Sequence, residues 1–355
     1  MENRMPVVSA KSNAFRSLSI VGSTLILLAF GLTIGCSGEG GGKSSGTKFV
    51  TLGSAPVGGV FNQVGAAIAS VADEHKGEAK WKVQAKGTSG SKDNIRKLDK
   101  GEIQLGMSNS AISYHAARGL SGWDKEYDIR AVTTLAPNIG LFITKKDSGI
   151  NTIADLKGRS VSVGPAGAGF EMFLGPLLSE HGVKYSGSAD DSDFTPQNEI
   201  YTAAVQSLAD GQTDAAFMGG AVPTPAVVQA CNSNDIHFVT YDAAVRAKLI
   251  KEFPFFSPAT IPATNKEGKA TYKGMESDFE AMNVGSMQLI THASVDEDLV
   301  YNLTKTIWEN RAEIVKQHPA AKAINEKNAA RNTGTEFHPG AIRFYKEIGI
   351  WPEAE

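Results

Sequence analysis

The amino-acid sequence predicts an α/β protein of two lobes, and three observations support this fold class. Apolar runs of strand length alternate with amphipathic segments from residue 49 onward, a pattern typical of parallel sheets covered by helices. About 300 residues follow the N-terminal segment, enough for two domains of ordinary size. Residues 98–107 and 208–217 also share a weak pattern of helix, glycine and buried strand, although any helix-to-strand connection can have it.

The first 35 residues have the features of a signal segment that is removed from the mature protein. Basic residues precede an apolar stretch at 18–32, which is too short to predict a membrane span. Cys36 follows Thr33-Ile34-Gly35, which resembles a lipobox, although Thr33 stands where that motif usually has leucine. A Gly- and Ser-rich tether at 36–47 comes next. We expect a secreted protein of the periplasm or cell envelope, held to the membrane only by lipid on Cys36.

Composition excludes several classes of protein. The formal charge is −3, and the removed segment carries +2, so the mature chain carries −5. A mildly acidic chain without a basic run gives no reason to expect nucleic acid as a partner. Cys231 has no partner once Cys36 is modified, so we expect no disulfide and a small buried apolar side chain at this position.

The first half of the mature chain predicts one lobe, and the next hundred residues a second. In the first, strands are expected at 49–52, 81–85, 103–107 and 129–135, with helices over 60–71 and around Ile95 and Leu98. In the second, strands are expected at 141–144, 160–163, 215–218 and 236–240. Its helices are expected to start at 151–155 and to cover 172–181, 203–209 and 226–230.

Beyond residue 253 the pattern changes. Pro254, Pro258 and Pro262 predict irregular structure until a strand at 284–291, which could cross back to the first lobe. A long helix is expected over 299–315, ended by Pro319, and a short one after Pro339. Lobe 1 is therefore expected to comprise residues 48–138 and 246–355, and lobe 2 residues 139–245.

Three turns rich in glycine and hydroxyl side chains, each between a strand and a helix, are the candidate binding elements. A helix start offers unpaired N–H groups, and glycine allows a ligand to approach the backbone. Each turn alone is better explained as tight-turn chemistry, but together they would form a pocket for a carboxylate or phosphate. The candidate ligand-binding residues are Gly58, Gly59, Val60 and Phe61; Thr88, Ser89, Gly90, Ser91 and Asn94; Gly167, Ala168, Gly169, Phe170 and Glu171; and, between the turns, Ser108, Asn109, Ser110 and Asn138.

Enzyme, metal and cofactor signatures are incomplete, so no catalytic residue, metal or cofactor is expected. Residues 106–110 come nearest to a Gly-x-Ser-x-Gly elbow, but Ser110 replaces the second glycine. The seven histidines lack zinc spacing. The order of Gly164, Gly167 and Gly169 reverses that of the dinucleotide fingerprint. For His338, beside a proline turn, we expect a structural role, and a hydrogen bond across an interlobe face is the alternative.

The chain resembles the TAXI class of solute-binding proteins, the extracytoplasmic receptors of TRAP transporters. The resemblance covers residues 48–351, and the order and spacing of its motifs are specific. The motifs are residues 53–61, Gly90-Ser91-x-x-Asn94 with Gly101-Glu102, residues 155–158 leading to 161–165, residues 211–215 and residues 338–345. The resemblance implies a type II periplasmic-binding-protein fold, with a hinge and a ligand cleft between the lobes. It also implies delivery of glutamate, a related amino acid or a dicarboxylate such as 2-oxoglutarate to an ion-driven permease.

The chain departs from the family pattern at three positions. Asn62 replaces a frequent second aromatic residue, and Ala168 and Phe170 stand where relatives often have hydroxyl side chains. Each lost neutral hydrogen bond is worth about 0.5–1.5 kcal/mol. We therefore expect a ligand carboxylate on the backbone N–H groups of Ala168, Gly169 and Phe170. A more apolar or bulkier portion of the ligand would meet Phe61 and Phe170.

The sequence thus predicts a monomeric, lipid-anchored receptor that passes a small organic anion to the membrane subunits of a TRAP permease. Two alternatives stay open. One is a sensory receptor of the same fold that signals through a membrane partner, which a neighbouring permease gene would argue against. The other is a transferase or hydrolase, which would lose turnover when Ser89 or Ser108 is changed.

Overall fold

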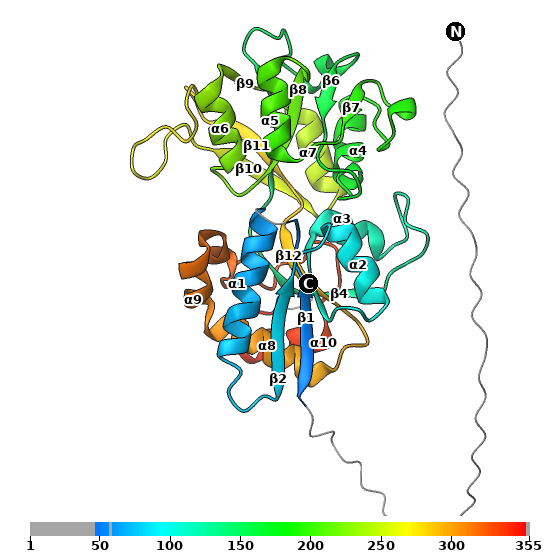
Figure 1. Cartoon of the computed structure of the whole chain (residues 1–355), viewed down its shortest axis with the longest axis vertical. Coiled ribbons are helices and arrows are strands. Elements are labelled where there is room, and N and C mark those ends of the chain that lie inside the picture. Colours follow the sequence, from blue (N-terminus) through cyan, green and yellow to red (C-terminus); the bar gives the residue numbers. More distant parts are fainter. Residues whose placement is uncertain (1–46, 57–58, 353–355) are drawn as a thin grey trace, which may run out of the picture. The chain divides into compact units, whose positions relative to one another are not determined.

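Two mixed β-sheets, each covered by helices, form the two lobes of the described chain (Figure 1). The structure is a computed structural model that describes residues 47–56 and 59–352. The signal segment, Cys36 and Gly58 of the first turn lie outside the described residues. No helix in the described part of the chain is both long and apolar enough to cross a membrane.

The sheet of lobe 1 has the strand order β2-β1-β3-β12-β4. Its strands are β1 (Lys48–Gly53), β2 (Trp81–Lys86), β3 (Leu105–Asn109), β4 (Ile129–Thr134) and β12 (Met287–His292). β1 runs parallel to β2 and β3, whereas β12 runs antiparallel to β3 and β4. The strand expected to cross back from the C-terminal half therefore does so. The helices α1 (Val60–Glu74), α2 (Ser91–Asp99) and α3 (Ser110–Ala116) follow β1, β2 and β3.

The sheet of lobe 2 has the order β10-β11-β5-β8-β6-β7, with β9 also paired to β5. Its strands are β5 (Ile139–Lys145), β6 (Ser160–Ser162), β7 (Thr195–Gln197), β8 (Ala215–Gly220), β9 (Ile236–Phe238), β10 (Phe256–Ile261) and β11 (Phe279–Val284). Its helices are η1 (Ile153–Leu156), α4 (Glu171–Glu180), η2 (Ala189–Asp191), α5 (Tyr201–Asp210), α6 (Pro225–Ser233) and α7 (Ala243–Glu252). Cys231 is buried in α6, as expected, and burial raises the pKa of its thiol to about 11.

The proline-rich segment after residue 253 forms β10, contrary to expectation. β10 ends the sheet and pairs with β11, so Pro258 sits on an edge strand, where a missing N–H group is tolerated. β11 in turn pairs with β5. The expectation that all of residues 246–355 belong to lobe 1 is therefore wrong for β10 and β11, which extend the sheet of lobe 2.

The C-terminal helices pack on the lobe 1 sheet, on the same side as α1. The long helix expected over 299–315 is two helices, α8 (Glu297–Glu309) and α9 (Arg311–Gln317), divided at Asn310. η3 (Pro319–Ala323) and α10 (Pro339–Glu347) follow. His338 caps α10: its Nδ1 accepts from the Gly340 N–H, and its Nε2 lies 3.0 Å from the Val295 carbonyl. Its role is structural and lies within lobe 1.

Two crossing segments, residues 135–138 and 284–287, join the lobes and pair with each other. The Leu135 N–H donates to the Met287 carbonyl, and the Val284 N–H to the Asn138 carbonyl, at 2.7 and 2.9 Å. The Asn283 carboxamide accepts from the Asn138 N–H at 2.9 Å. One buried apolar cluster also contains residues of both lobes, among them Ile112 of α3 and Phe173 of α4. The lobes therefore share both a backbone hinge and part of their core.

Candidate ligand-binding site

The first turn leaves the start of α1 without a side-chain cap. Gly59 is the N-cap residue in an extended conformation, and no acidic side chain lies in the first turn of α1. The backbone N–H groups at Val60 and Phe61 therefore lie at the positive end of the helix dipole with no side-chain partner. Asn62 points back instead, and its Nδ2 donates to Ser54 Oγ at 2.9 Å and to the Ala55 carbonyl at 3.0 Å.

The second turn is largely satisfied within lobe 1. The Ser89 N–H donates to Asp93 Oδ2 and the Gly90 N–H to Thr88 Oγ1, at 3.1 and 3.3 Å. Ser91 Oγ accepts from the Asn109 N–H at 3.0 Å. Asp93 also places a negative charge in the first turn of α2, as Glu171 does in the first turn of α4, where Lys92 offsets it.

The polar residues expected to assist the turns mostly hold the fold together. Asn94, Ser108 and Asn109 are at most 3% exposed. Ser108 Oγ donates to the Asn109 carbonyl and accepts from Ser113 Oγ, while Asn109 Oδ1 caps α3 through the Ala111 N–H. Ser110 Oγ is buried and has no hydrogen-bond partner among the described residues. Asn138 lies in the hinge, where its side chain contacts Gly219.

The third turn keeps open donors at the start of α4. The Ala168 N–H donates to the Pro165 carbonyl at 3.2 Å, so one of the three expected ligand donors is already used. In the described part of the chain, the N–H groups of Gly169 and Phe170 have no acceptor. Gly169 has a positive φ of 89° and lies against the Ile112 side chain of lobe 1. The turn therefore sits where the two lobes meet.

Phe170 belongs to the core of lobe 2 as well as to its surface. Its ring packs against Phe173 and Phe217, with centroids 5.1 and 6.1 Å away. The ring also covers Gly164, where a Cβ would come within 2.4 Å of Phe170 Cδ2. Only a residue without a side chain fits at Gly164, so the sequence of this turn fixes the position of the phenyl ring.

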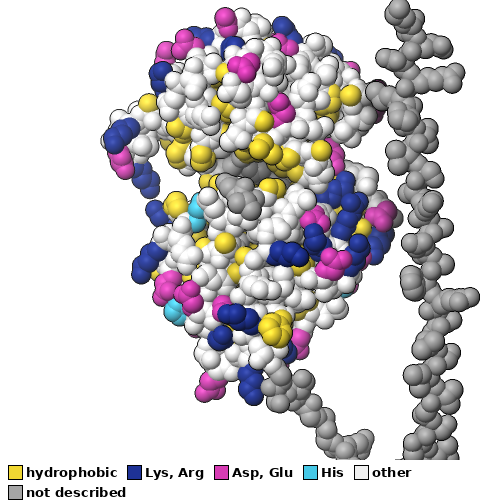
Figure 2. All heavy atoms as spheres, in the orientation of Figure 1, with side chains coloured by type: hydrophobic (Ala, Val, Ile, Leu, Met, Phe, Trp, Pro, Cys, Tyr) yellow, Lys and Arg dark blue, Asp and Glu magenta, His cyan; other side chains and the backbone are white. Residues whose placement is uncertain are grey.

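Beside the third turn lies a cavity of about 240 Å³ that both lobes line. Lys92 of α2 comes from lobe 1, and Gly164, Gly167, Phe170, Glu171 and Tyr185 come from lobe 2. Phe61 does not line this cavity; it packs on the core of lobe 1. Hydrophobic side chains gather along the hollow between the two lobes (Figure 2). The structure therefore brings Gly167, Phe170 and Glu171 of the third turn to one cavity with Lys92. The other candidates do not line it: Phe61, Ala168, Gly169, and Thr88, Ser89, Gly90, Ser91 and Asn94 of the second turn.

An ion pair across the lobes borders this cavity. Lys92 Nζ lies 3.2 Å from Glu171 Oε1, and the two side chains are 19% and 26% exposed. Lys92 also lies 5.7 Å from the centroid of the Trp123 ring. Burial, and then the negative charge of Glu171, raise the pKa of the Tyr185 phenol well above its ordinary value. Lys92 was not among the candidate binding residues expected from the sequence. Its position directly after Ser91, in the first turn of α2, could have indicated it.

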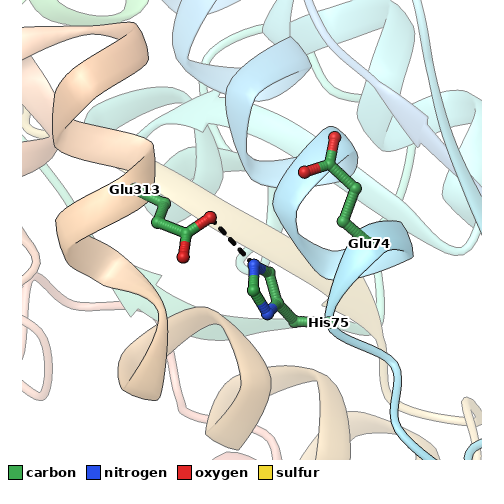
Figure 3. Close-up of side chains that lie close together, drawn as sticks. All are labelled: Glu74, His75 and Glu313. Carbon is green, nitrogen blue, oxygen red and sulfur yellow. Dashed lines mark hydrogen bonds and ion pairs between the residues drawn. The ribbon is translucent and has the colours of Figure 1, made fainter.

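A second polar cluster joins the end of α1 to α9 in lobe 1 (Figure 3). The third turn precedes α4 in the other lobe (Figure 1). His75 Nε2 lies 2.9 Å from Glu313 Oε2, and ligand-type atoms of Glu74, His75 and Glu313 lie within 4.8 Å of one another. The Glu74 carboxylate accepts from Ser70 Oγ, and the only dashed line in Figure 3 joins His75 to Glu313. The His75–Glu313 contact is a partly exposed side-chain interaction between the end of α1 and α9.

Comparison with known proteins identifies the family and supports the fold. The chain belongs to the NMT1-like family, whose model matches residues 52–349. XAC2383 from Xanthomonas citri, in a structure bound to ATP, is 10% identical with a TM-score of 0.51, over 85% of this chain and 96% of that chain. The periplasmic aliphatic sulphonate binding protein SsuA from Escherichia coli is 13% identical with a TM-score of 0.43, over 86% and 89%. The two α/β lobes have the periplasmic-binding-protein fold.

Proposed function

We propose that the protein is an extracytoplasmic solute-binding receptor that captures a small organic anion between its lobes and delivers it to a TRAP-type, ion-driven permease. The observation that carries this proposal is the interlobe cavity, where Lys92 of lobe 1 faces Phe170 of lobe 2, whose N–H group at the start of α4 is open. An ammonium group and an uncapped helix start are both groups that bind carboxylates.

Binding would proceed from the third turn. A ligand carboxylate would accept from the N–H groups of Gly169 and Phe170, and the Phe170 ring would contact an apolar part of the ligand. Lys92 would reach the same anion from lobe 1 once the lobes close about residues 135–138 and 284–287. A closed, loaded receptor differs in shape from an open one, and a permease can recognise that difference.

The membrane side of the proposal rests on the N-terminal sequence. Lipid on Cys36 would hold the receptor at the membrane, and the Gly- and Ser-rich tether would allow it to reach a permease subunit. We expect a monomeric receptor of the periplasm or cell envelope, without catalytic activity of its own.

Calorimetric titration tests the ligand class. The mature chain carrying Cys36→Ser is unfolded, dialysed free of bound ligand and refolded, and is then titrated with amino acids, monocarboxylates, dicarboxylates and their uncharged amides. Binding heat is expected from the anions and not from the amides. Heat from uncharged ligands alone contradicts the anion proposal.

Transport in vesicles tests the partner. Vesicles that contain the candidate permease should accumulate the bound anion only when the receptor and an ion gradient are both present. Equal uptake with and without the receptor contradicts the assignment to that permease.

A further inference from the structure

The interlobe cavity has a balanced pair of charges. Among its lining residues, Lys92 is the cation and Glu171 the carboxylate, and the remaining side chains are apolar or uncharged. The two charged groups come from the first turns of α2 and α4, so they belong to different lobes. When the cavity is empty, the Lys92 ammonium is therefore neutralised by Glu171 rather than left for a ligand alone.

Both charged side chains are held at the cavity wall. Glu171 packs its methylene carbons against Gly187, where a Cβ would lie 3.2 Å from Glu171 Cβ. The Trp123 ring flanks Lys92, and both charged groups are less than one third exposed. Charges in such partly buried positions are screened by salt less than surface charges are. A ligand in the cavity therefore interacts electrostatically with both Lys92 and Glu171.

The ammonium group of Lys92 has three N–H donors, and Glu171 accepts from it in the structure. A ligand carboxylate can accept from a second donor while Glu171 keeps the first. A second ligand carboxylate has no further cation among the lining residues, and within about 240 Å³ it would lie near Glu171. Like charges at this range repel each other.

We propose that the Lys92–Glu171 pair sets the net charge of the ligand, so that the site selects a monoanion or a zwitterion over a dianion of the same length. This inference rests on the proposed function and narrows its substrate class. Glu171 acts as the residue that excludes a second carboxylate, and Lys92 as the residue that binds the first.

Titration of the mature chain carrying Cys36→Ser, with three probes of equal carbon chain length, tests this inference. The probes are pentanoate, glutarate and 2-aminopentanoate. The parent protein should bind pentanoate or 2-aminopentanoate at least about tenfold more tightly than glutarate, because the second carboxylate of glutarate would be repelled by Glu171. Glu171→Gln should shift the ratio towards glutarate by about tenfold, and Lys92→Gln should weaken binding of all three probes.

Matched variants separate the charge rule from general effects of substitution. Lys97→Gln changes a lysine of α2 that pairs with Asp93, and Glu180→Gln changes a glutamate at the far end of α4 that pairs with Lys248. Both should leave the ratio unchanged. The double variant Lys92→Glu with Glu171→Lys keeps the pair and the net charge, so it should keep the preference against glutarate.

The outcomes distinguish this inference from the proposed function. Binding of the anions with the same ratio in the parent and in Glu171→Gln contradicts the charge rule alone, as does a parent protein that prefers glutarate. A parent protein that binds none of these or any other organic anion contradicts the proposed function and the charge rule together. Circular dichroism of each variant checks that it is folded, and the double variant still tests the rule if Glu171→Gln does not fold.

Discussion

At the scale of single residues, several side chains that the sequence assigns to a ligand hydrogen-bond to the backbone. Asn94 Nδ2 lies 3.0, 2.8 and 2.8 Å from the carbonyls of Gly53, Ser54 and Met107. Its two protons are therefore shared among carbonyls at the end of β1 and within β3. A polar residue in a glycine-rich turn is ambiguous in sequence, because it can bind a ligand or hold the turn that does.

Asn94→Ala should lower the free energy of unfolding by about 1–3 kcal/mol, since it leaves buried carbonyls without a donor. Asn302→Ala is the control: the Asn302 carboxamide donates to the Asp298 carbonyl on the exposed side of α8. Urea denaturation measures both variants. Equal losses would show that Asn94 does not hold β1 to β3.

His115 makes stability depend on pH. The side chain is 4% exposed, and burial, followed by repulsion from Arg118, lowers its pKa from 6.5 to about 4. Above pH 6.5 the imidazole is neutral in both the folded and the unfolded chain and contributes nothing to the pH dependence. Between pH 6.5 and 4 the unfolded chain binds a proton that the folded chain does not, so stability falls as pH falls.

His115→Gln should therefore reduce the stability lost between pH 7.5 and pH 5 by about 2 kcal/mol. Urea denaturation at the two pH values gives this difference. The same substitution at His292, a less buried histidine that bonds to Ser294, serves as the control. An unchanged pH dependence in His115→Gln would mean that His115 is protonated in the folded protein.

At the scale of elements, the C-terminal helices show how closely packing fixes the sequence. A Cβ at Gly340 would lie 2.3 Å from the Glu297 carbonyl oxygen and 2.7 Å from the Tyr301 nitrogen. α10 thus begins in direct contact with the backbone of α8, and His338 caps α10 at this contact. His338 and Gly340 both support the contact between α10 and α8. This packing role accounts for the two residues without a bound ligand.

Gly340→Ala should destabilise the protein by about 1–3 kcal/mol, the usual cost of overpacking. The expected sign is informative, because alanine in place of glycine in a helix otherwise stabilises by about 1 kcal/mol. Thermal or urea denaturation measures the change. A gain in stability would show that α8 and α10 separate easily.

At the scale of the whole described chain, a shared apolar cluster and a paired hinge connect the lobes. The cluster reaches from Ile290 of β12 to Phe217 of β8, so it crosses from one sheet to the other. The crossing segments are hydrogen-bonded to each other on both sides of the junction. We therefore expect the lobes to lose their structure together.

Urea should unfold both lobes in a single transition. The four tryptophans lie in lobe 1, so their fluorescence reports that lobe, whereas far-UV circular dichroism reports both. Coincident midpoints are expected. Two separate midpoints would show that the shared cluster does not couple the lobes.

The sequence predicted most of the strands and helices but fewer of the site contacts. Local periodicity was sufficient for β1, α1 and the strand that returns to lobe 1. It was insufficient for β10, because Pro258 argues against a strand unless the edge position is known. Periodicity also did not reveal that the C-terminal helix is divided into α8 and α9 at Asn310, because asparagine does not strongly disrupt helices. The Lys92–Glu171 pair joins residues 79 positions apart, and only the folded chain reveals it.

The burial of Cys231 has a practical consequence. A thiol that is 1% exposed and has a pKa of about 11 is protonated at neutral pH and out of reach of maleimide reagents. With Cys36 changed to serine, a cysteine introduced on the surface of each lobe would carry a fluorescent dye without competition from Cys231. Energy transfer between the two dyes would then follow the opening and closing of the lobes in single molecules.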